Sequence, residues 1–89
     1  MTKHEDDEYQ VLVNQIRADL VSAYGPIIGG SNLRKVLGYS TSGAFRQAVY
    51  SKTVPIEIFT IEHRRGKFAL SIDVAKWAAQ QKLLRTEND

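Results

Sequence analysis

The chain has 89 residues, of which 43% are hydrophobic and 25% are charged, and these proportions are typical of one globular domain with a modest core. No apolar run approaches the roughly 20 residues of a membrane span, and the N-terminal region is acidic rather than apolar, so we expect neither a membrane segment nor a signal peptide. The lack of cysteine excludes disulfides and thiolate metal sites and fits a reducing cytoplasm. Because 89 residues are too few for two independent cores, we expect a single cytoplasmic domain over residues 1–89.

Residues 5–24 are predicted to form one long helix. Apolar residues recur there at spacings of three and four, which is the period of one helical face: Tyr9, Leu12, Val13, Ile16, Leu20 and Tyr24. Gly25-Pro26 predicts the end of the helix, because proline disfavours helical backbone at the residue before it. Val11, Ala18 and Val21 extend the apolar surface. This second edge either packs on the core or pairs with another subunit, as a homodimer through the N-terminal helix.

A second, shorter helix is predicted to follow the hinge formed by Gly29-Gly30. Ser31 is its expected N-cap, since the hydroxyl can accept a hydrogen bond from an unpaired backbone N–H. Gly38 suits the left-handed position that ends a helix. The apolar face of this helix consists of Leu33, Val36 and Leu37.

A third helix is predicted from a cap at Ser40, Thr41 or Ser42 to about residue 51, before Val54-Pro55. Its residues divide into two faces. The packing face has Phe45, Ala48 and Val49, and the opposite face has Arg46, Gln47 and Tyr50. That division is typical of a recognition helix, in which one side packs and the other carries donors and acceptors.

A β-hairpin and a closing helix complete the chain. Residues 56–62 are rich in β-branched and aromatic side chains and predict a strand. His63-Arg64-Arg65-Gly66 predicts the turn, in which Gly66 can take positive φ, and residues 67–70 predict the return strand. Ser71 is the expected cap of a helix over residues 72–84. The predicted fold is therefore mainly α with a small β-hairpin.

The positive charge is concentrated in the middle of the chain. Residues 31–67 carry seven basic and two acidic side chains, a net charge of +5, whereas residues 1–30 carry a net charge of −3. Such asymmetry is typical of a surface that binds polyanions. The alternative is an unevenly charged but otherwise ordinary solvated surface.

Four sequence elements between residues 33 and 77, about half the chain, carry a family resemblance. They are Leu37-Gly38-Tyr39-Ser40, Val54-Pro55, Arg64-Arg65-Gly66, and Asp73-Val74 followed by Trp77. In this order they resemble the small winged-helix domain of MerR-type regulators and of phage excisionase and AlpA-like proteins. The resemblance implies a winged helix-turn-helix over residues 31–84, to which the long N-terminal helix is an addition. Lys52-Thr53 stand where the family often has a glycine, and Gly43 weakens the start of the third helix.

The function that the resemblance implies is sequence-specific binding of double-stranded DNA, by a small transcriptional regulator or an excisionase-like architectural factor. The third helix would enter the major groove, and the turn of the hairpin would contact phosphates or the minor groove. The implied DNA-binding residues are Ser42, Arg46, Gln47, Tyr50 and Lys52 near the third helix, and Arg64, Arg65 and Lys67 on the hairpin. Taken alone, Arg46 and Gln47 are more typical of a solvated helix face. The alternative for Tyr50 is cover of the core edge, and for Arg64-Arg65 it is a soluble hairpin tip.

We expect no catalytic, metal or cofactor site and no small-molecule substrate, so the chain is predicted not to be an enzyme. His4 and His63 are far apart in sequence and lack cysteine partners. Serine and threonine at a helix start are far more often caps than nucleophiles. The alternative function is a protein-interaction adaptor that uses the acidic first helix on a helix-turn-helix scaffold.

Overall fold

The computed structural model describes the backbone of residues 3–88 and the side chains of residues 7–84. This part of the chain forms a mainly α-helical fold with a small antiparallel sheet, in agreement with the predicted fold class. Its elements, in order, are α1 (Lys3–Tyr24), β1 (Ile27–Gly29), α2 (Gly30–Leu37), α3 (Ser42–Tyr50), β2 (Phe68–Leu70) and α4 (Ser71–Asn88). Among the described residues, no helix combines the length and the apolarity that crossing a bilayer requires.

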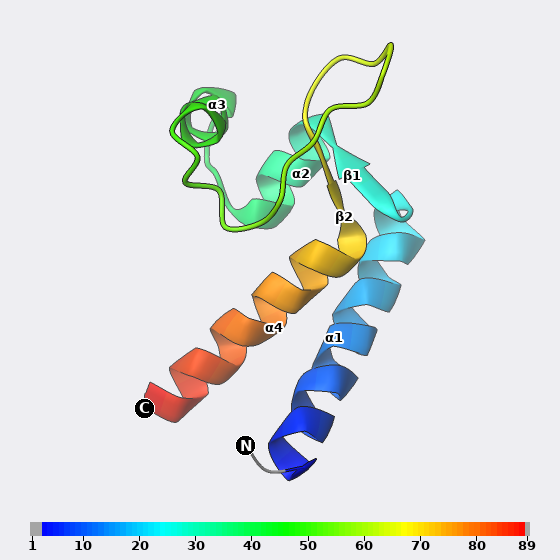
Figure 1. The fold of residues 1–89 in the computed structure, drawn as a ribbon, viewed down its shortest axis with the longest axis vertical. Helices are drawn as coiled ribbons and strands as arrows, with labels where there is room; N and C mark the ends of the chain where they lie inside the picture. The colour runs from blue at the N-terminus through cyan, green and yellow to red at the C-terminus, as the bar shows by residue number, and fades with distance from the viewer. Residues whose placement is uncertain (1–2, 89) are drawn as a thin grey trace.

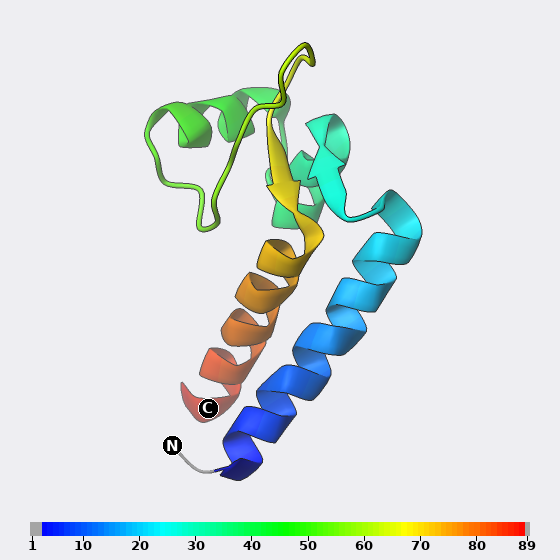
Figure 2. The same cartoon turned by 45° about the vertical axis from the view of Figure 1, so that its right-hand side comes forward.

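The two long helices lie antiparallel, side by side, and form one end of the elongated molecule (Figures 1 and 2). Their contact is built on Val13 of α1 and on Ala75 and Ala79 of α4, which are at most 2% exposed. The small alanine side chains let α1 approach α4 closely. The predicted apolar face of α1 therefore covers α4. The second apolar edge stays outside this contact, with Val11 55% exposed.

A second hydrophobic cluster fills the other end of the molecule, where α2, α3 and the sheet meet the start of α4. Its buried members are Ile28, Leu33, Leu37, Phe45, Ala69 and Val74. The rings of Tyr39 and Phe45 add a tilted contact with their centroids 5.4 Å apart. This cluster fixes α3 relative to the sheet, so the surface between them has a defined shape.

The sheet differs from the predicted hairpin. β2 pairs with β1, with Ile28 opposite Ala69, and the prediction of a strand over residues 56–62 was wrong. In that segment only Phe59 meets β2, through two hydrogen bonds of 2.9 Å with Phe68. β1 was missed because three residues between a proline and two glycines give too short a pattern to predict a strand.

Residues 60–67, here called the basic loop, project beyond the sheet at the top of Figure 1. His63 and Gly66 have φ values of 66° and 98°, and positive φ at both positions turns the chain sharply. The predicted positive φ at Gly66 is thereby confirmed. The loop thus leaves the ladder after Phe59 and rejoins it at Phe68.

Two of the three predicted caps differ in the structure. The N-cap of α2 is Gly29 rather than Ser31, and it makes no side-chain hydrogen bond. Ser71 is buried, and its hydroxyl makes a tertiary hydrogen bond instead of capping α4. It donates to the carbonyl of Gly25 at 2.7 Å and so joins the end of α1 to the start of α4. Thr41 does cap α3, since its Oγ1 accepts from Ala44 N at 3.0 Å.

Gly29, predicted as part of a hinge, lies in β1 directly against the ring of Phe68. A Cβ atom at Gly29 would lie 2.5 Å from two carbons of that ring. We expect Gly29→Ala to lower the free energy of unfolding by about 1–3 kcal/mol, because the ring must shift to admit the methyl group. Urea denaturation measures the loss. Gly43→Ala is the control, since its Cβ would meet only Thr41 Oγ1 at 3.9 Å; equal losses would contradict the close packing of Phe68 on Gly29.

Candidate nucleic-acid interface

Two hollows adjoin each other between α3 and the segment that runs from residue 54 through the basic loop. The first, here called the basic hollow, has a volume of about 420 Å³. The second, here called the apolar groove, has a volume of about 680 Å³. Val49 and Lys67 line both of them. The two hollows share these two residues, and together they are here called the concave face.

The basic hollow brings together residues from three parts of the chain. Ser42 and Arg46 come from α3, Lys67 from the basic loop and Arg34 from α2. The rest of its lining is small or apolar: Gly30, Ser31, Phe45, Val49 and Gly66. The lining therefore has three basic residues and no acidic one. These basic side chains can pair with a phosphate or another anion.

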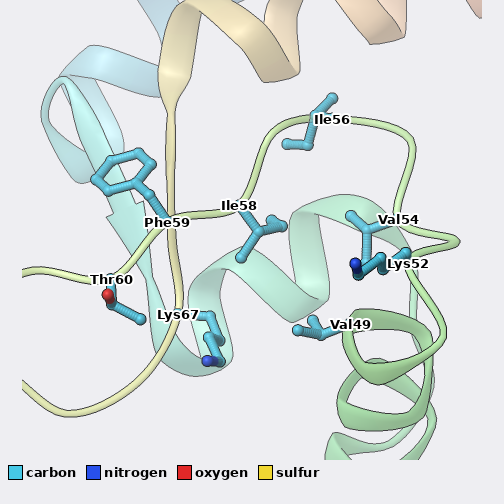
Figure 3. A pocket seen from close by; sticks show the side chains of 8 residues that line it. All are labelled: Val49, Lys52, Val54, Ile56, Ile58, Phe59, Thr60 and Lys67. Atoms are coloured by element: carbon cyan, nitrogen blue, oxygen red, sulfur yellow. The ribbon is translucent and has the colours of Figure 1, made fainter.

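The apolar groove lies beside the basic hollow and has a different chemistry. Figure 3 shows Val49 of α3 and Ile58 of the opposite segment directed into the space between them. In the same view Lys67 and Lys52 flank Ile58 on its two sides. The groove is lined by Val49, Lys52, Val54, Ile56, Ile58, Phe59, Thr60 and Lys67. Its walls therefore combine five apolar side chains with two ammonium groups and one hydroxyl.

The other residues singled out on α3 lie outside both hollows. Gln47 is exposed, and its Nε2 donates to Ser51 Oγ at 3.2 Å. Tyr50 is 83% exposed. Both side chains are open to solvent, so any contact they make with DNA lies beyond the concave face itself.

The basic loop carries Arg64 and Arg65 away from the hollows. Both side chains are exposed, and Arg64 N donates to Ile61 O at 3.0 Å, which closes the turn. His63 Nε2 lies 3.4 Å from a carboxylate oxygen of Glu62, but both side chains are almost fully exposed. A contact of this kind contributes little to stability. The loop therefore presents two arginines with no acidic neighbour other than Glu62 within residues 60–67.

Arg34 is a site residue that sequence reasoning missed. Its Nη1 donates to the backbone carbonyl of Tyr39 at 2.7 Å, across the end of α2. This hydrogen bond holds the turn between α2 and α3 and keeps the guanidinium beside the basic hollow. A basic residue in the last turn of a helix is a common way to satisfy its terminal carbonyls. The place of Arg34 in the last turn of α2 was therefore the sequence signal that could have indicated this hydrogen bond.

Lys52 has an unusual backbone conformation. Its φ is 58°, in the left-handed region that costs a residue with a Cβ about 1–2 kcal/mol. This conformation lets the chain turn directly after α3. Non-glycine residues with such strain cluster at functional sites. Lys52 also lines the apolar groove.

Comparisons of the chain with family models, with curated proteins and with solved structures found no match.

Proposed function

We propose that the chain is a winged helix-turn-helix protein that binds double-stranded DNA sequence-specifically, as a small transcriptional regulator or an excisionase-like architectural factor. In this proposal α2 and α3 form the helix-turn-helix, α3 is the recognition helix, and the basic loop is the wing. The observation that carries it is the basic hollow, where Arg34, Arg46 and Lys67 converge from three elements with no acidic residue in the lining.

The division of labour follows from the chemistry of the side chains. The guanidinium of Arg46 and the amide of Gln47 match the donor and acceptor patterns of guanine and adenine in the major groove. The hydroxyl of Ser42 suits a phosphate oxygen, as does the phenol of Tyr50. Lys67 and the loop arginines neutralise phosphates on the flanking backbone.

Selection of bound sequences from a random duplex pool tests sequence recognition. The wild type should enrich a discrete motif. Arg46→Ala should enrich a motif relaxed at one or two base pairs, because a lost bidentate contact costs about 1–3 kcal/mol at its own base pair. A pool that stays random with the wild type would contradict specific recognition.

Salt dependence tests the phosphate contacts. With roughly 3–5 phosphates neutralised per subunit, the slope of log affinity against log salt should be about −3 to −4.5. Arg64→Ala combined with Arg65→Ala should flatten the slope by about one to two units and weaken all sequences nearly equally. Fluorescence anisotropy with a labelled duplex at several salt concentrations measures both. A flat response in the wild type would count against DNA binding.

The adaptor remains the second candidate, because α1 presents a surface that its packing on α4 does not use. Val11 is 55% exposed and Val21 is 36% exposed, and a shallow hollow of about 290 Å³ lies beside Val11. We also propose that the same surface of α1 can form a homodimer. Indifference to DNA at every salt concentration would favour the adaptor.

A further inference from the structure

The apolar groove has the volume of a small-molecule site. Its volume of about 680 Å³ falls within the roughly 300–1,000 Å³ of such sites. The groove is therefore large enough to hold a small molecule.

Four apolar side chains in the walls of the groove are only partly covered by the core. Val49, Val54, Ile56 and Ile58 pack against the buried cluster but are themselves only half-buried. Figure 3 shows the side chains of Val49 and Ile58 on facing walls of the groove. A hydrocarbon group in this space removes apolar surface from water on both sides, which favours binding.

The charges around the groove specify an anion. Lys52 and Lys67 line it, and no acidic residue does. Within the part of the chain that the structure describes, neither ammonium group has an ion-pair partner. Lys52 is held there by a strained backbone, with φ at 58°.

We propose that the apolar groove binds a small amphipathic carboxylate. Its hydrocarbon part lies between Val49 and Ile58, its carboxylate is bound by Lys67, and Lys52 adds positive charge on the other side of Ile58. Because Lys67 also lines the basic hollow, the bound carboxylate neutralises a group that contacts DNA. Occupancy of the groove therefore lowers DNA affinity, a consequence that rests on the proposed function.

Decanoate and decanol, at concentrations below decanoate micelle formation, are the probes for the full chain without DNA. Isothermal titration calorimetry should give decanoate at least tenfold tighter binding than the neutral alcohol. Amide NMR shifts should be concentrated at Val49 and Ile58. Equal binding of the two probes, or shifts located elsewhere, would overturn the proposal.

Lys52→Asn combined with Lys67→Gln removes both ammonium groups, and asparagine tolerates the left-handed backbone at position 52. Decanoate affinity should fall to that of decanol. The control is Lys35→Gln with Lys76→Gln, two exposed lysines outside the groove, which should bind decanoate as the wild type does. Equal losses in both double variants would contradict a localised carboxylate site.

A separate titration with labelled duplex tests the effect on DNA. Decanoate should weaken DNA binding of the wild type at least threefold. Adding decanoate should not change the DNA affinity of the Lys52→Asn, Lys67→Gln variant, whatever that affinity is without decanoate. Decanoate binding with unchanged DNA affinity would overturn the coupling and support the site. Decanoate binding by a chain that binds no DNA would overturn the proposed function and support the site.

Discussion

Reversing two charges at the basic hollow, with Arg46→Glu and Lys67→Glu together, should weaken duplex DNA binding about a thousandfold. Each substitution removes a cation from the lining and places a carboxylate next to phosphate. Loss of one charged partner at a desolvated contact costs about 2–5 kcal/mol. Two such losses therefore amount to three decades or more in affinity. Fluorescence anisotropy at constant salt concentration measures the change.

The matched control for this double reversal is Lys35→Glu with Lys76→Glu. It changes the net charge by the same amount, and both lysines are exposed and outside the two hollows. It should lose only the long-range attraction, which is screened beyond about 8 Å at physiological salt, so its affinity should fall less than tenfold. Similar losses in both double variants would mean that net charge, and not the concave face, accounts for DNA binding. Circular dichroism of each variant verifies that it is folded.

The helices were the part of the fold that sequence could predict. A period of 3.6 over residues 5–24 leaves little ambiguity, and Gly38, with φ of 90°, has a sequence signal of its own. The sheet was harder to predict from the sequence. The β-rich composition of residues 56–62 predicted a strand, but only Phe59 of that segment pairs with β2, whereas Ile27–Gly29 pairs with its whole length. Which segment pairs along the full strand is a tertiary effect.

For the candidate site, the sequence predicted several of the charged residues but not how they are arranged in space. Arg46 and Lys67 stand out because they lie in the basic segment of the chain, but their meeting around one hollow depends on how the buried cluster orients α3. Arg34 was missed because its hydrogen bond to Tyr39 O is a contact across a turn. The apolar groove was missed for a related reason: Val54, Ile56 and Ile58 have the composition of core residues, and their half-exposure appears only in three dimensions.

The largest change in stability is expected from a substitution in the core beneath the candidate site. Leu33 is fully buried within the cluster that joins α2 to α3 and the sheet. Leu33→Ala should lower the free energy of unfolding by about 2–5 kcal/mol, since it removes apolar contacts and leaves a cavity. The whole stability of a domain this size is only about 4–13 kcal/mol.

Leu84→Ala makes the same chemical change at a position that is 51% exposed, and it should cost well under 1 kcal/mol. Urea denaturation of both variants, followed by circular dichroism, gives the comparison. The cavity left by Leu33→Ala lies beneath the elements that carry the candidate site. If the variant remains folded, its DNA affinity should therefore fall although no charge has changed. Equal stability of the two variants would contradict the buried cluster. Unchanged DNA affinity in a destabilised Leu33→Ala would show that the concave face keeps its shape without full packing beneath α2.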